Sequence, residues 1–252
     1  MHPLTASALL DVWERGAGRT PVEQALVILE AAFPQAGRDV LARMTVPERD
    51  ACLLSLHELT FGSQLNGLAS CPACGERIEM SFDGRDLCQP GAPLSDPETK
   101  TPQNPERSFS VEGCSVTFRL PTSLDLLSAV RLADADQAQR QLLEACLLSA
   151  RRGRKAIPIS ELTAGVLEAI VEHMGEAVAM ADPSLAVTCP ACGHEWTLLF
   201  DIGSYFWSEI SAWAMRLMHE VHVLASAYGW READILSMSA WRRRAYLELV
   251  GL

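Results

Sequence analysis

Four of the eight cysteines in this 252-residue chain lie in two identical Cys-Pro-Ala-Cys-Gly segments, at 71–75 and 189–193, each termed a knuckle. Two residues between the cysteines let both sulfurs face one point, and the glycine permits a left-handed turn that aims backbone N–H groups at a thiolate. Four thiolates fill a tetrahedral shell, which is typical of a structural and not a catalytic metal site. We therefore predict one structural Zn²⁺ ion bound across a separation of 115 positions (189 − 74) by Cys71, Cys74, Cys189 and Cys192.

The main alternative for the knuckles is a redox-active Cys-x-x-Cys pair of the thioredoxin kind. Such a pair normally opens a helix. Here apolar and polar residues alternate after both knuckles, at 78–82 and 196–200, which predicts strands. A redox role also leaves the duplication of the motif unexplained, so the sequence favours a metal site.

Three histidines offer alternative ligands. His194 adjoins the second knuckle and could replace one cysteine, although four cysteines are already available. His219 and His222 are three positions apart on a predicted helix, one position short of the His-Glu-x-x-His spacing of zinc enzymes. We expect these two to be partly exposed side chains without a metal.

Four cysteines lie outside the knuckles. Separate metal sites that recruit Cys88 or Cys114 are a further alternative to the single site. Cys52 and Cys146 lie in apolar helical stretches and are expected to be small buried residues, as free cysteines often are.

The knuckles belong to a longer internal repeat. In each copy a Phe-Asp pair follows, and the aspartate lies 12 positions after the first cysteine (83 − 71 and 201 − 189). We therefore expect two knuckle–strand units that pack as a pseudo-symmetric pair and form a small zinc-ribbon-like sheet.

Helical patterns flank these units, so the predicted class is α+β and mainly α-helical. Capping boxes with proline at the first helical position begin helices at Thr20 and Thr45. A long helix over 204–228 ends at Gly229, and two short helices follow, the last one capped by Ser239.

Between the knuckles the pattern predicts a hairpin and then more helix. Apolar residues alternate on both sides of Glu112-Gly113, as in a β-hairpin. Helical periodicity follows over 123–150 and 160–181, with a basic loop at 151–155.

We predict one metal-tied domain with five segments. They are N-terminal helices (1–62), the first knuckle and strand (63–88), a flexible loop rich in proline (89–107), an inserted hairpin with helices (108–184), and the second knuckle, strand and C-terminal helices (185–252).

Charge and motifs narrow the function. The net charge of −11 argues against general nucleic-acid binding, which needs an excess of Lys and Arg. The basic runs 151–155 and 242–244 are more typical of solvated loops or ion-pair partners. No nucleophile elbow, phosphate-binding loop or dinucleotide fingerprint is present, so we expect no enzymatic activity.

The sequence also bears on location. No run of about 18 apolar residues predicts a membrane span, and no secretion signal is visible, so we expect no membrane partner and a cytoplasmic protein.

Several segments resemble baseplate proteins of T-even-like phages and related contractile injection systems, usually described as baseplate hub assembly proteins or chaperones. The resemblance runs from about Leu53 onward and is most specific in the last thirty residues. The segments that carry it are CPACGE, CPACGHEW, FRLPTSLDL and HVLASAYGWREADILSMSAWRRRAYLELV.

The resemblance implies a protein that helps to fold or join the tail hub through contacts with baseplate hub or tail proteins. It places the chain in the cytoplasm of the host or producing bacterium and leaves open whether the mature particle carries it. Aromatic residues and methionines concentrate between Phe206 and Trp241, which favours a protein interface in this region. The alternative function is a zinc-ribbon regulator that binds nucleic acid, for which a basic face around the knuckles would be the sign.

Overall fold

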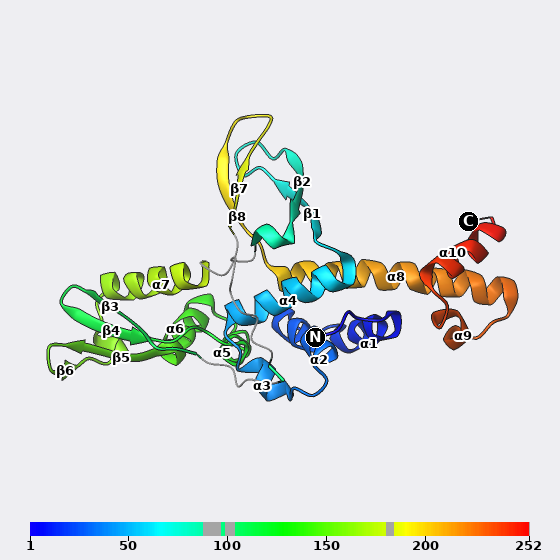
Figure 1. Ribbon diagram of the computed structural model, residues 1–252. Coiled ribbons are helices and arrows are strands. Elements are labelled where there is room, and N and C mark those ends of the chain that lie inside the picture. The colour runs from blue at the N-terminus through cyan, green and yellow to red at the C-terminus, as the bar shows by residue number, and fades with distance from the viewer. Residues whose placement is uncertain (88–96, 99–103, 180–183, 252) are drawn as a thin grey trace.

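The computed structural model describes residues 1–87, 97–98, 104–179 and 184–251. Figure 1 shows a central group of helices from which three parts project: a pair of hairpins, a sheet with its own helices, and a long helical arm. The N-terminus lies in the central group and the C-terminus at the end of the arm. The predicted class, α+β and mainly helical, is confirmed.

The central group consists of N-terminal helices and the first half of the longest helix. Both predicted capping boxes are confirmed: the side chains of Thr20 and Thr45 accept the backbone N–H groups of Glu23 and Glu48, whose carboxylates accept the threonine N–H groups. These bonds satisfy donors that a helix start otherwise leaves unpaired. The helices are α1 (Ala6–Gly16), α2 (Pro21–Ala32), α3 (Arg38–Ala42), α4 (Val46–Phe61) and α8 (Ile202–Tyr228).

The predicted insert (108–184) contains a four-stranded antiparallel sheet with strand order β3-β4-β5-β6, whose first strand begins one residue earlier, at Arg107. The predicted hairpin about Glu112-Gly113 joins β3 to β4, and both of its turn residues have positive φ. The elements are β3 (Arg107–Val111), β4 (Cys114–Phe118), α5 (Ser123–Ala129), α6 (Ala135–Cys146), β5 (Leu147–Arg152), β6 (Lys155–Ala156), the short 3₁₀ helix η2 (Ile159–Glu161) and α7 (Ala164–Ala179).

The prediction of continuous helix over 123–150 is wrong. The helix breaks between Ala129 and Ala135, and from Leu147 the chain is a strand that pairs with β4. Short apolar stretches such as 147–150 suit either a helix or a strand, and the free edge of β4 decides between them. The predicted basic loop 151–155 is therefore the β5–β6 turn and its flanking strand residues.

Each knuckle connects the two strands of a hairpin. The hairpins are β1 (Gln64–Ser70) with β2 (Arg77–Asp83) and β7 (Ser184–Thr188) with β8 (Glu195–Leu199). The strands after the knuckles were predicted, whereas those before them were not. The two hairpins come together as the predicted zinc-ribbon-like unit requires, but they form two separate two-stranded sheets and not the single sheet expected.

The arm is the second half of α8 with α9 (Glu232–Leu236) and α10 (Ala240–Leu249) packed against it (Figure 1). Gly229 ends α8 with φ 68°, and Ser239 accepts the N–H of Arg242 as the predicted N-cap. None of the described helices is long and apolar enough to cross a membrane.

The apolar side chains form three cores. Leu29, Leu53 and Phe206 are fully buried in the central one. A second core lies inside the insert, and a third joins α8, α9 and α10. The predicted segment boundaries remain a prediction, and most of the expected loop 89–107 lies outside the described residues.

Candidate metal centre

The four knuckle cysteines converge on one point. The Sγ atoms of Cys71 and Cys192 are 3.7 Å apart, and those of Cys74 and Cys189 are 3.6 Å apart. All four sulfurs lie within 4.8 Å of one another. Zn–S bonds of about 2.3 Å in a tetrahedron hold the sulfurs about 3.8 Å apart, so this donor set fits one ion of that size.

Both knuckles have the same local structure. The N–H of Cys71 donates to the carbonyl of Glu76 at 2.8 Å, and Gly75 N–H donates to the carbonyl of Cys71 at 2.9 Å. The second knuckle repeats both bonds at the same lengths from Cys189 and Gly193. Gly75 and Gly193 have φ values of 78° and 72°, a region where glycine avoids the strain of a Cβ atom.

Each knuckle has one buried and one exposed cysteine. Cys71 and Cys189 are buried, while Cys74 and Cys192 are exposed. Burial opposes ionisation of Cys71, but the backbone N–H groups of Cys74 and Ala73 and the adjacent thiols lower its pKa to about 7. The backbone N–H of Glu76 favours the thiolate of Cys74, yet hydrogen bonds with the neighbouring thiols, that of Cys192 first, and partial shielding of its sulfur from water raise its pKa to about 12.

These opposed pKa shifts follow from the crowding of four acidic thiols. One thiolate is readily accommodated, and further negative charge at the same point is repelled. A cation in the centre removes this repulsion, so its binding should release protons. The donor set therefore fits a soft cation, and four sulfur ligands leave no coordination position for a substrate.

The repeated Phe-Asp pairs hold the two hairpins in place. Phe82 and Phe200 pack edge to face with ring centroids 5.3 Å apart, which joins the hairpins beyond the cysteines. Asp201 caps α8 by accepting the N–H of Gly203 at 2.9 Å. Asp83 likewise accepts the N–H of Arg85 at 2.9 Å, where the 3₁₀ helix η1 (Gly84–Leu87) begins.

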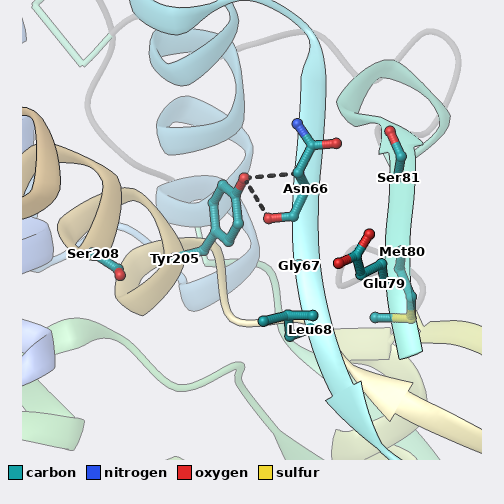
Figure 2. Close-up of a pocket in the computed structure, with 8 residues that line it drawn as sticks. All are labelled: Asn66, Gly67, Leu68, Glu79, Met80, Ser81, Tyr205 and Ser208. Atoms are coloured by element: carbon teal, nitrogen blue, oxygen red, sulfur yellow. Dashed lines mark hydrogen bonds between the residues drawn. The ribbon is translucent and has the colours of Figure 1, made fainter. Parts of the chain in front are cut away.

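Tyr205 of α8 connects the first hairpin to the helices. Its hydroxyl accepts the N–H of Asn66 at 2.9 Å and donates to the carbonyl of Asn66 at 3.1 Å (Figure 2). Beside this contact lies a groove of about 550 Å³ between β1, β2 and α8, whose lining includes Leu68 and Met80. Burial raises the pKa of Tyr205, so its hydroxyl stays protonated and can donate.

A buried histidine extends the contact to α4. His57 is 2 % exposed, and its Nε2 forms a hydrogen bond with the carboxylate of Glu209 on α8. Its ring packs against Tyr205 and Phe206. The sequence analysis missed His57, Tyr205 and Glu209. The only sequence feature that could have pointed to this cluster is the four-residue spacing of Tyr205 and Glu209, which places both on one face of a helix. Nothing in the sequence indicates that this face meets His57.

The alternative ligands lie elsewhere. His194 is exposed and stacks on Trp196, and His219 and His222 are exposed on α8. Cys114 and Cys146 are buried in the core of the insert. Cys52 is also buried, whereas Cys88 lies outside the described residues. Among the described residues, the knuckle cysteines form the one cluster of three or more possible ligands.

The surroundings of the knuckles are acidic rather than basic. Glu76, Glu79 and Glu195 are all exposed there. The basic face expected of a nucleic-acid-binding zinc ribbon is therefore not formed by these segments.

The two basic runs differ in their surroundings. Residues 151–155 are exposed at the end of the insert. In the second run, Arg243 is 5 % exposed and its Nε pairs with Glu220 at 2.9 Å, while Arg244 pairs with Glu248. Ion pairing was thus the right expectation for two of the three arginines at 242–244.

One family model matches most of the chain. No curated protein and no solved structure matches the chain. Residues 21–207 match the family model described as T4 bacteriophage base plate protein, which is more than half of the chain and includes both knuckles. The match begins before Leu53 and ends before the last thirty residues, where the resemblance was expected to be most specific. The chain belongs to the T4 bacteriophage base plate protein family.

Proposed function

We propose that this protein is a non-enzymatic assembly factor or structural component of a baseplate hub, in a phage or a related contractile injection system. Family membership supports the baseplate role. The observation that best supports a role through protein contacts is the exposed outward face of α10, which we term the C-terminal surface. It comprises Trp241, Arg244, Ala245, Glu248 and Leu249.

Apolar residues are spaced along this surface as for helix docking. Trp241, Ala245 and Leu249 lie four positions apart, so they share one face of the helix. Trp241 is 80 % exposed and Leu249 77 % exposed, so two large apolar side chains on one helix face, two turns apart, are open to a partner. Tryptophan and arginine are enriched among the residues that dominate binding energy at protein interfaces.

Other aromatic residues of this region have structural roles. Trp207 and Trp213 pack against the apolar cores. Trp230 stacks on Tyr228, with ring centroids 4.5 Å apart, and meets Tyr246 edge to face. Trp230, which belongs to the aromatic-rich segment from Phe206 to Trp241, is therefore a packing residue and a poor choice for a binding test.

We also propose that the ion in the cysteine cluster is zinc with a structural role. Two Cys-x-x-Cys pairs with all-sulfur coordination are typical of such zinc sites. Cys71 and Cys74 would hold the ion from the first hairpin, and Cys189 and Cys192 from the second. The ion would supply cross-linking between segments distant in sequence, and this closed shell supports a non-enzymatic role.

The test is recovery of partners from cells that express the neighbouring baseplate genes. Tagged wild-type protein should co-purify with a hub or tail protein, and Trp241→Ala/Leu249→Ala should reduce recovery at least tenfold. Leu59→Ala/Leu148→Ala is a matched control, because these residues are 51 % and 45 % exposed on other elements. Equal recovery by all three proteins, or loss of recovery only through unfolding, would place the interface elsewhere.

Incorporation into the particle is a separate part of the proposal. Quantitative mass spectrometry of purified particles should detect the chain at a fixed ratio to the tail proteins if it is a structural component. Presence in cytoplasmic assembly intermediates but not in particles would identify it as an assembly factor.

A further inference from the structure

The tip of the insert carries four positive charges on a negatively charged protein. Arg151, Arg152, Arg154 and Lys155 are all exposed around the β5–β6 turn, at the opposite end of the molecule from the arm (Figure 1). The rest of the chain has a net charge of −15 (−11 − 4). In the described residues, none of the four cations lies within 4.0 Å of a carboxylate.

The hairpin itself gains nothing from this arrangement. Arg152 and Lys155 are directly opposite each other on paired strands, so their side chains project from the same face. Like charges in this position destabilise a hairpin. Gly153, with φ 60°, makes the tight turn that brings them together.

Helix α7 carries the opposite charge in a similarly unfavourable arrangement. Glu168, Glu172 and Glu176 are exposed and four positions apart, so they form an acidic stripe on one face. Glutamates at this spacing repel one another. Val171, 40 % exposed, lies beside the stripe, and Glu176 has His173 as a partner at 3.1 Å.

The two patches match in spacing. Side chains directly opposite on antiparallel strands have Cβ atoms about 4.5–5.5 Å apart. Side chains four positions apart on a helix have Cβ atoms about 5–6 Å apart. Arg152 and Lys155 can therefore face Glu168 and Glu172 one to one, and pairing relieves the repulsion within both patches.

We infer that the basic tip of one molecule docks on the acidic stripe of a second copy of this chain. Tip and stripe are different surfaces, so the contact is head to tail, and it extends to further copies as a ring or an open chain. The observations favour a second copy over nucleic acid as the occupant, because the stripe on this chain offers carboxylates at the spacing of the tip cations, whereas the net charge of −11 opposes the approach of either partner as a whole. This contact is independent of the C-terminal surface and of the proposed function.

Sedimentation velocity of the whole 252-residue chain, loaded with zinc, tests the inference. At about 20 mM salt the sedimentation coefficient should rise with protein concentration, and at about 500 mM salt it should not, because screening then acts within a few ångströms. Two reversals, Arg152→Glu/Lys155→Glu and Glu168→Lys/Glu172→Lys, should each abolish association. All four substituted residues are exposed, and each reversal keeps like charges at the two substituted positions, so neither should destabilise the fold.

Mixing the two variants should restore association, because each supplies the surface that the other has reversed. Arg131→Glu/Arg140→Glu is the control, since it reverses two exposed cations elsewhere in the insert and should leave association unchanged. The inference is overturned if the wild-type protein stays monomeric at low salt, or if the reversals have no effect. Tip-dependent binding of a short DNA duplex by a monomeric wild-type protein would also overturn it and identify nucleic acid as the partner.

Discussion

Replacing Tyr205 by phenylalanine should loosen the attachment of the first hairpin to α8. The tyrosine hydroxyl makes two hydrogen bonds to the backbone of Asn66, at 2.9 and 3.1 Å, and the substitution removes both while the ring contacts with His57 and Phe200 remain. One hydrogen bond contributes about 0.5–1.5 kcal/mol net, so two contribute about 1–3 kcal/mol. Asn66 is exposed, and water can replace part of this loss. We therefore expect a loss of about 1–2 kcal/mol.

A loss of this size should lower the melting temperature of a protein of this length by roughly 2–8 °C. Hydrogen exchange localises the effect: the amide of Asn66 should exchange faster, and the cores of the insert and the arm should be unchanged. Tyr246→Phe is a matched control, because the Tyr246 hydroxyl makes no protein hydrogen bond in the described structure. Wild-type stability together with wild-type exchange at Asn66 would refute the attachment role of this hydroxyl.

Three further substitutions probe the metal, an ion pair and a close contact. Protein purified without chelators should hold about one zinc per chain by mass spectrometry, and Cys192→Ser should lose it and aggregate or unfold in part, because structural zinc contributes about 10–16 kcal/mol in small fingers. Asp125→Asn should cost about 1–3 kcal/mol in urea unfolding at pH 7, because Asp125 accepts two bonds from Arg119, at 2.7 and 2.8 Å, and caps α5. Gly16→Ala should cost about 1–3 kcal/mol, because a Cβ atom there would lie 2.3 Å from the ring of Trp207.

Each of these predictions has a distinct opposing outcome. Zinc-free protein would refute the metal site, and a reversible disulfide in its place would support the redox alternative. Burial opposes the low pKa of Asp125, but Arg119 and Thr122 hold it below the ordinary 3.8. Its contribution is therefore complete above about pH 4 and lost as the pH falls through the folded-state pKa, so a wild-type advantage over Asp125→Asn that persists at lower pH contradicts this account. Gly175→Ala is the control for Gly16, since nothing lies near its Cβ position, and it should stabilise α7 by about 0.5–1 kcal/mol.

Local features were readable from the sequence because they depend on neighbours along the chain. A capping box needs only a threonine and a glutamate three positions apart, as at Thr20 and Thr45, and a helix end such as Gly229 needs only a residue that tolerates positive φ. The duplicated Cys-Pro-Ala-Cys-Gly motif was sufficient to predict which four sulfurs meet, although 115 positions (189 − 74) separate the two pairs.

Apart from the cysteine cluster, contacts between distant segments were decided by the tertiary structure. Residues 147–152 (LLSARR) are mostly good helix formers, yet they became a strand because β4 offered unpaired backbone groups, and this pairing overrode the local preference. The meeting of His57, Tyr205 and Glu209 likewise depends on how α4 packs against α8, and the exposure of Trp241 beside the packing of Trp230 depends on how α10 lies on α8. Periodicity and spacing determine the faces and ends of single elements, whereas the energy of bringing two faces together depends on partners that the local sequence does not contain.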